Sequence, residues 1–281
     1  MDERAKFPLP KIPGVEYITR KTLLNPSKIE WVDRCCNHYV GCAHGCKYPC
    51  YARLISRRSP EAWSQVKVVE NALELIKKEI PKLKEQKLHR EEILLSSMTD
   101  PYQPIEREQE LTNRILRVFI REKMRFKILT KSDLITRDLE LLTNAHHARM
   151  GFTFITLDEK QRKLWEPNSS SINARSEALL KAHYTYNLPT FVSMEPIILG
   201  VTKPLEIIEE FADEVDFWIF GKHNYAPMNL EHHYVAMREQ IIKECRERGL
   251  KYLIKSELLE VKNTTKAGSY QMSLKKYVGK S

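Results

Sequence analysis

The segment Asn37–Arg53, with the sequence NHYVGCAHGCKYPCYAR, is the most informative stretch of the chain. It contains Cys42, Cys46 and Cys50 in a C-x3-C-x3-C arrangement. Glycine and proline lie between and beside these cysteines, so the segment is predicted to be a loop rather than a helix or a strand. Five of the six cysteines of the chain fall between Cys35 and Cys50. This clustering indicates a shared chemical role for the thiols of the loop.

Three thiolates on one short loop favour one kind of metal site over another. A [4Fe–4S] cluster held by only three cysteines keeps one iron open to a substrate or cofactor, whereas a structural zinc site closes all four positions. For zinc, the additional ligand would come from Cys35, Cys36, His38 or His44. These candidates do not form a second ligand-bearing knuckle, so the open iron–sulfur cluster is the favoured interpretation.

The composition excludes an integral membrane protein. The mean hydropathy is -0.47, and no stretch approaches the ~20 consecutive apolar residues that a membrane-spanning helix needs. The first residues, MDERAKFPLPKIPG, have acids and no apolar core typical of a secretory signal. We therefore expect a cytoplasmic protein without a membrane partner, in which clustered cysteines are metal ligands or catalytic groups rather than disulfides.

Outward from the cysteine loop, short apolar runs alternate with amphipathic segments. The runs predict strands at Trp31–His38, Glu92–Ser97, Phe126–Thr130, Gly151–Thr156, Pro189–Met194, Asp216–Gly221 and Lys251–Lys255. The segments between them predict helices at Glu61–Lys78, Glu106–Arg121, Leu134–Thr143, Asn173–Tyr186, Leu205–Phe211 and Glu231–Arg248. This order implies right-handed crossovers and a mostly parallel sheet that is covered on both faces. We predict an α/β fold, specifically a partial (β/α)6 TIM-type barrel.

The position of the cysteine loop fits that fold. It follows the first predicted strand, so it lies on the face where βα barrels place their chemistry. Residues 1–30 are predicted to be an extended N-terminal arm outside the core, because their prolines disfavour helix. Residues 31–261 form the predicted barrel domain, and residues 262–281 form a basic C-terminal tail.

The charge of the chain points towards a polyanionic partner. Lysine and arginine number 46 against 37 aspartates and glutamates, for a formal net charge of +9. Arg53, Arg57 and Arg58 lie just beyond the cysteine loop. A basic surface of this kind attracts nucleic acid, so a DNA or RNA substrate is one interpretation. The other is an ordinary lysine-rich, well-solvated exterior.

Four segments together carry a resemblance to a known superfamily. Asn37–Arg53 resembles the "GC-x-HGC-x-YCYAR" cluster loop of the radical SAM superfamily, in the form typical of spore photoproduct lyase-like proteins. The segments SSMTDPYQPIE (Ser96–Glu106), ILTKS (Ile128–Ser132) with the following RDLELL, and FITLDEKQRKLWEPNSSSINAR (Phe154–Arg175) resemble further segments of that group. They occur in the same order over roughly residues 37–220. Pro49 is a departure, because it lengthens the second cysteine spacing from C-x2-C to C-x3-C.

The resemblance implies a barrel of the radical SAM kind and an enzyme that cleaves S-adenosylmethionine (SAM) reductively to methionine and a 5′-deoxyadenosyl radical. Cys42, Cys46 and Cys50 would ligate a [4Fe–4S] cluster. SAM would bind the open iron, and an electron donor such as ferredoxin or flavodoxin would reduce the cluster. The substrate is left unassigned.

The resemblance also implies SAM-binding residues. Lys131 and Arg175 would meet the SAM carboxylate, where cations make charge-assisted hydrogen bonds. Tyr48 or Tyr51 would pack near the adenine, and Thr153 would assist the amino acid moiety. The remaining implied contacts are Ser97, Thr99 and Asp100, with Glu166 and Glu195 as further candidates.

Two features keep the reaction open. Relatives that cleave a thymine dimer return a hydrogen atom from a cysteine near the second strand, where this chain has Ser96, Ser97 and Met98. This difference argues against the same repair reaction unless Cys35, Cys36 or a tyrosine supplies the hydrogen. The rival hypothesis from another class is a non-catalytic iron–sulfur or zinc protein that binds nucleic acid through its basic surface.

Overall fold

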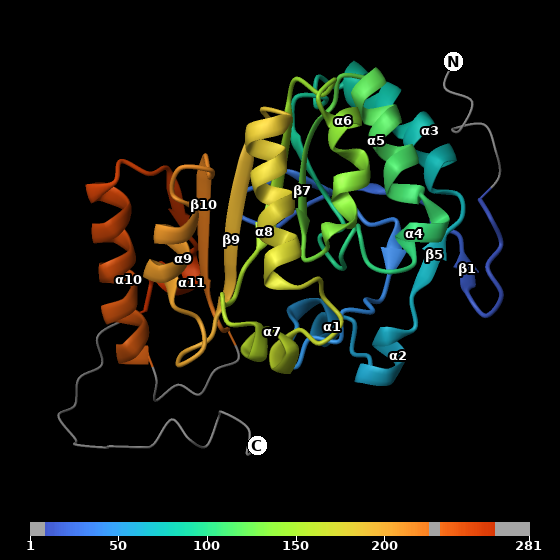
Figure 1. The fold of residues 1–281 in the computed structure, drawn as a ribbon. Helices are drawn as coiled ribbons and strands as arrows, with labels where there is room; N and C mark the ends of the chain where they lie inside the picture. Colours follow the sequence, from blue (N-terminus) through green and yellow to red (C-terminus); the bar gives the residue numbers. More distant parts are fainter. Residues whose placement is uncertain (1–8, 225–230, 262–281) are drawn as a thin grey trace.

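A large parallel sheet organises the protein (Figure 1). The structure, a computed structural model, describes residues 9–224 and 231–261. Neighbouring strands of the sheet follow the order β11-β10-β9-β8-β7-β6-β3-β2, in which only the edge strand β2 is antiparallel to its neighbour. The strands are β2 (Leu24–Pro26), β3 (Arg34–Cys36), β6 (Glu92–Leu95), β7 (Arg125–Thr130), β8 (Ala148–Thr153), β9 (Thr190–Ile197), β10 (Phe217–Lys222) and β11 (Tyr252–Ile254). The predicted α/β fold with a mostly parallel sheet is confirmed.

The apolar runs became strands because both faces of the sheet are covered. Strands β8 and β9 have buried side chains on nearly every position, which requires apolar residues in succession rather than in alternation. The helices are α1 (Tyr51–Ile55), α2 (Pro60–Ser64), α3 (Ala72–Glu85), α4 (Glu106–Gln109), α5 (Leu111–Arg121), α6 (Leu139–Leu142), α7 (Glu159–Trp165), α8 (Ile172–Leu180), α9 (Pro204–Phe211), α10 (Glu231–Glu247) and α11 (Ser256–Leu259). On the outside of the sheet, α3 packs against α5, and α9 packs against α10 (Figure 1).

The segment before β3 packs across the inner face of the sheet. The Trp31 carbonyl accepts a hydrogen bond of 2.8 Å from Lys127 of β7, and its ring meets Phe191 of β9 edge-on at 5.6 Å. The Glu30 carboxylate accepts the backbone N–H of Ser256, at the start of α11. One short segment thus contacts strands and helices from both halves of the sheet, which lies folded around it.

The N-terminal segment contributes more to the fold than predicted. Leu23 and Leu24 are buried in the main core, so the prediction that the first thirty residues lie outside the core is wrong for them. The reason is that β2 pairs with β3 and covers that edge of the sheet, while Glu79 accepts both leucine N–H groups. A second, three-stranded sheet of order β1-β5-β4 also forms, from β1 (Glu16–Ile18), β4 (Tyr39–Val40) and β5 (Lys67–Val69).

The prediction of one continuous helix over Glu61–Lys78 is wrong for the middle of that range. Residues there form α2, then β5, then α3, because Val68 and Val69 are β-branched and pair with strands on both sides. The predicted helix Glu106–Arg121 is divided at Glu110, which has a left-handed φ of 49°. Leu134–Thr143 is a 3-10 helix, η2 (Asp133–Asp138), followed by α6.

The remaining boundaries stay predictions. The division at residues 30 and 261 is an expectation from composition, and the predicted basic tail at residues 262–281 lies outside the described residues. Within the described ranges, none of the helices combines the length and the apolar character needed to cross a membrane.

Candidate active site

A cavity of about 400 Å³ opens at the carboxyl ends of the parallel strands. The cysteine loop forms one end of its wall, and the ends of β9, β10 and β11 form the other. The predicted site residues on its wall are Cys42, Cys46, Tyr48, Cys50, Tyr51, Ser97, Thr99, Asp100, Lys131 and Thr153. The further candidate Glu195 is also on this wall, whereas Arg175 and the further candidate Glu166 are not.

Glycines give the cysteine loop its path. Gly41 has a φ of +88°, and a Cβ there would lie 2.6 Å from the Trp63 carbonyl oxygen. The next residue, Cys42, donates its N–H to that same carbonyl at 2.9 Å. Gly45 has a φ of +66°. Only glycine adopts these angles without strain, so the loop can present its three thiols on one side.

A buried glutamine clamps the loop backbone. The Gln103 side chain accepts the Ala43 N–H at 3.0 Å and donates to the Gly41 carbonyl at 3.2 Å and to the Thr99 hydroxyl at 2.9 Å. Thr99 in turn donates to the Gly41 carbonyl at 2.5 Å. Thr99 thus contacts the loop through its hydroxyl, and the segment after β6 fixes the position of the loop.

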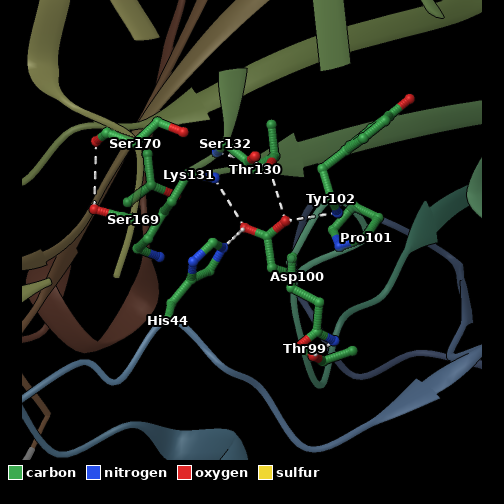
Figure 2. Close-up of polar contacts among 12 residues, drawn as sticks. His44, Thr99, Asp100, Pro101, Tyr102, Thr130, Lys131, Ser132, Ser169 and Ser170 are labelled. Carbon is green, nitrogen blue, oxygen red and sulfur yellow. Dashed lines mark hydrogen bonds and ion pairs between the residues drawn. The ribbon is translucent and has the colours of Figure 1, made fainter. Parts of the chain in front are cut away.

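Asp100 joins the loop to two strand ends (Figure 2). One carboxylate oxygen accepts the Tyr102 N–H at 2.8 Å and the Thr130 hydroxyl at 2.7 Å. The other accepts the Lys131 N–H at 2.8 Å and lies 3.1 Å from Nε2 of His44. Burial alone would raise the pKa of Asp100, but His44 and these donors outweigh it and lower the pKa to about 2. Both oxygens are occupied by the protein, so Asp100 acts in holding the site together.

A second buried carboxylate, Glu166, lies behind the opposite side of the loop. It accepts the Tyr48 hydroxyl at 3.0 Å and the Arg175 guanidinium at 3.0 Å, and the Lys131 ammonium lies 3.9 Å away. Burial alone would lower the pKa of Lys131, but Glu166 and its other anionic neighbours raise it. Arg175 is fully buried and also donates to the Thr153 carbonyl at 2.7 Å. It therefore supports the cavity wall from behind.

The three thiols are of the residue type that holds a [4Fe–4S] cluster. Burial raises the pKa of Cys42 to about 11 and that of Cys46 to about 12, while Lys131 opposes the shift for both. Among the described residues, no three His, Cys, Asp or Glu side chains are grouped tightly enough to surround one ion. In a [4Fe–4S] cluster each cysteine binds its own iron, so three spaced thiols fit that group.

The candidate zinc ligands are engaged elsewhere. The His38 ring lies 2.8 Å from the Thr112 hydroxyl, and burial lowers the pKa of His38 to about 4. Cys35 lies 3.3 Å from the Asn37 amide nitrogen, and neither Cys35 nor His38 lines the cavity. His44 lies within contact of Asp100. Of these zinc candidates only His44 lines the cavity, and it is paired with Asp100, so the three thiols are the donors that the loop offers to a metal group.

The far end of the cavity, at the ends of β9, β10 and β11, contains polar groups of which sequence reasoning identified Glu195 but neither Ser193 nor Lys255. Ser193 of β9 is fully buried, and its hydroxyl has no hydrogen-bond partner. Glu195 forms an ion pair with Lys255, which also lies 3.0 Å from Glu257. Burial raises the pKa of Glu195, although Lys255 opposes the shift. A Cβ on Gly221 would lie 2.9 Å from the Glu195 side chain, so glycine leaves the room that Glu195 occupies. Ser193 and Lys255 could have been identified from their position in the sequence, because they lie at the ends of predicted strands.

Comparison with known proteins identifies the family. A family model described as "Protein of unknown function (DUF5131)" matches residues 26–269. The chain belongs to this family. An uncharacterized protein of Methanocaldococcus jannaschii is 34% identical over 220 residues, covering 78% of this chain and 81% of that protein. An uncharacterized protein of Acidianus two-tailed virus is 29% identical and covers 79% of this chain and 81% of its own length.

Solved structures share the fold at low sequence identity. Spore photoproduct lyase complexed with dinucleoside spore photoproduct matches with a TM-score of 0.64 at 13% identity, over 85% of this chain and 82% of that chain. A mutant of that lyase with bound AdoMet and dinucleoside spore photoproduct gives a TM-score of 0.68 at 13% identity, over 85% and 81% of the two chains. Streptococcus suis SuiB bound to S-adenosylmethionine gives 0.50 at 12% identity, over 64% and 41%. This chain therefore shares its fold with spore photoproduct lyase and with part of SuiB.

Proposed function

We propose that this chain is a radical SAM enzyme. The observation that carries the proposal is that Cys42, Cys46 and Cys50 lie on the wall of one cavity at the carboxyl ends of parallel strands. The fold shared with a lyase structure that contains bound AdoMet supports it. On this proposal the curved sheet is the partial barrel of the radical SAM kind.

The three thiols of the loop would hold a [4Fe–4S] cluster, and the cavity would hold SAM. When bound, these groups supply reductive cleavage of SAM to methionine and a 5′-deoxyadenosyl radical, which takes a hydrogen atom from the substrate. Lys131 extends its ammonium beside Glu166 on the cavity wall, where a cation can bind the SAM carboxylate. Thr153 lies at the end of β8 on the same wall.

The other predicted residues act mainly by positioning. Arg175 acts through Glu166 and the Thr153 carbonyl. The hydroxyls of Tyr48 and Tyr51 donate to Glu166 and to the Ser97 carbonyl, so their rings are the parts available to pack against adenine. Asp100 and the residues bonded to it hold the loop against β6 and β7 and keep the cavity in shape.

The substrate and partners are part of the same proposal. Tyr51 and Ile55 line the cavity and are 41% and 65% exposed, so α1 lies at its mouth. Arg53 belongs to α1, and Arg57 and Arg58 follow it. Exposed aromatic, apolar and basic groups at one mouth suit a DNA or RNA substrate. A ferredoxin or flavodoxin would supply the electron, and the cytoplasm would be the location.

Turnover of SAM tests this proposal. Protein reconstituted with iron and sulfide under anaerobic conditions and given dithionite should convert SAM to 5′-deoxyadenosine, measured by chromatography. Cys46→Ala protein should yield none, while Cys245→Ala protein should retain the activity because Cys245 is buried in α10, away from the cavity. A wild-type protein that binds iron or zinc and leaves SAM intact would instead support the non-catalytic metal protein.

A further inference from the structure

We propose that the surface formed by Lys47, Lys160, Lys163, Leu164 and Trp165, here called the α7 patch, is the docking site for an acidic one-electron carrier protein. The proposal rests on the proposed function. The reduced carrier would give one electron to the cluster. The carrier would thereby be oxidised by one electron, and the cluster would be reduced by one electron. We chose these residues because the cysteine loop is hydrogen-bonded to the end of α7, whose exposed side is basic and partly apolar.

The cysteine loop is bound directly to the end of α7. The Lys47 N–H donates to the Trp165 carbonyl at 2.8 Å, and the Asn168 side chain donates to the Ala43 carbonyl at 2.9 Å. Cys46 and Trp165 pack against the same apolar cluster, which contains Tyr48 and Ile155. A carrier seated on Trp165 would therefore lie one side-chain layer from a cluster ligand.

The exposed side of this contact has the composition of a docking surface. Leu164 is 46% exposed and Trp165 is partly buried, while Lys47, Lys160 and Lys163 are exposed around them. An apolar centre with a charged rim is typical of protein–protein interfaces. Basic rim groups of this kind attract an acidic partner and increase the rate of its encounter.

The positive charge of the patch is only partly offset locally, because Glu159 lies near enough to Lys163 to interact with it electrostatically. Within the described part of the chain, no carboxylate lies within ion-pair distance of Lys47, Lys160 or Lys163. The nearby acids have other partners. Glu159 binds Arg162 at 2.8 Å, and Asp158 caps α7 by accepting the Lys160 N–H at 2.7 Å.

The α7 patch is separate from the entrance to the cavity. None of its five residues lines the cavity, whereas Tyr51 and Ile55 of α1 do. The patch and the mouth thus have no residue in common. This separation favours an electron carrier over a nucleic acid on the patch, because a nucleic acid substrate must reach the mouth.

Two reductants distinguish docking from chemistry. Dithionite is small and needs no docking surface, whereas reduced flavodoxin, an acidic carrier, does. For the Lys160→Glu/Lys163→Glu variant we expect dithionite-driven formation of 5′-deoxyadenosine to equal wild type. The flavodoxin-driven rate at subsaturating carrier should fall about tenfold and should lose most of its dependence on salt. Lys160 lies in the first turn of α7, where a glutamate suits the helix dipole, and both lysines are exposed, so the variant should fold.

A matched control changes the same charges elsewhere. Lys77 and Lys78 are exposed on α3, far from α7 in Figure 1. Lys77→Glu/Lys78→Glu should keep both activities. As a second measurement, oxidised flavodoxin should bind wild type more tightly than the Lys160→Glu/Lys163→Glu and Leu164→Ala variants by calorimetry, which requires no turnover.

The outcomes separate the two proposals. If wild type with dithionite leaves SAM intact, the proposed function fails and the docking proposal fails with it. If wild type uses both reductants and the α7 variants match it in flavodoxin-driven rate and binding, only the docking site is overturned. Loss of DNA or RNA binding in the α7 variant, with flavodoxin use intact, would assign the patch to nucleic acid instead.

Discussion

The two ends of the cavity are built differently. At the cysteine-loop end, Gln103, Asp100 and Glu166 have hydrogen bonds or ion pairs with other residues of the protein. At the far end, the Ser193 hydroxyl is buried without a partner, and the ion pair of Glu195 and Lys255 lies on the cavity wall. At the first end the protein itself pairs these three side chains, although Nε and Nη2 of Arg175 behind them lack partners, whereas the second end leaves the Ser193 hydroxyl for a ligand. A preorganised end is suited to holding a cofactor, and an incompletely paired end is suited to recognising a substrate.

The largest expected effect is at the loop end. Replacing Cys42, Cys46 or Cys50 with alanine should abolish the [4Fe–4S] cluster, since each removes a ligand from one iron. Iron per protein after anaerobic reconstitution, with the absorbance of the cluster, measures this. Cys245→Ala should keep about four irons per chain. Loss of iron in the Cys245 variant, or full iron content in any of the other three, would contradict the assignment.

Replacing Arg175 should give the next largest effect, a decrease in the free energy of unfolding. Arg175→Ala would leave Glu166 buried without its closest cation, at a cost of about 3–5 kcal/mol in the free energy of unfolding. Arg248→Ala is the control, because Arg248 forms a surface ion pair with Glu244, whose loss should change the free energy of unfolding far less. Denaturant titration measures both. Similar losses for the two variants would show that Glu166 does not depend on Arg175.

The Gln103→Ala variant tests how much the cysteine loop depends on its hydrogen bonds to the Gln103 side chain. Gln103→Ala would leave the Ala43 N–H and the Gly41 carbonyl with fewer partners, and should lower the free energy of unfolding by about 1–3 kcal/mol. Gln86→Ala, at an exposed position after α3, should change it by less than about 0.5 kcal/mol. Cluster retention in air should also fall for Gln103→Ala. If the two glutamine variants behave alike, the loop is not clamped in this way.

Ser193 should give the smallest change in stability. Its hydroxyl has no partner to lose, so Ser193→Ala should leave the free energy of unfolding unchanged or raise it. The same variant should weaken binding of whichever ligand fills the far end, which SAM or substrate titration by calorimetry detects. A loss of stability as large as that of Gln103→Ala would mean that the two ends are not built differently.

Much of the sheet could be predicted because its signal is local. Strands buried on both faces require continuous apolar runs, and Phe126–Thr130 and Pro189–Met194 show such runs. Strand β5 was missed because Val66, Val69 and Leu73 also have helical spacing. Pairing with β1 and β4, which lie far away in sequence, decided between the two.

The site was predictable by position more than by role. Cys42, Lys131 and Thr153 line one cavity because parallel strands end on the same side, while their roles there stay predictions. The clamp by Gln103 and the unpartnered Ser193 depend on contacts between segments far apart in sequence, which no local pattern reveals. The role of Arg175 could not be predicted for the same reason. Its positive charge is evident from the sequence, but its contact with Glu166 is not. Glu166 contacts Arg175 with one carboxylate oxygen and Lys131 with the other.

The most direct test of the central claim is pulsed electron paramagnetic resonance of the reduced protein with SAM labelled with 15N at its amino group. If Cys42, Cys46 and Cys50 hold a cluster with one open iron, adding SAM should change the spectrum and produce a hyperfine coupling from the labelled nitrogen. Lys131→Ala should show the same coupling only at higher SAM concentration. A reduced cluster whose spectrum does not change with SAM, and which shows no nitrogen coupling, would contradict the account.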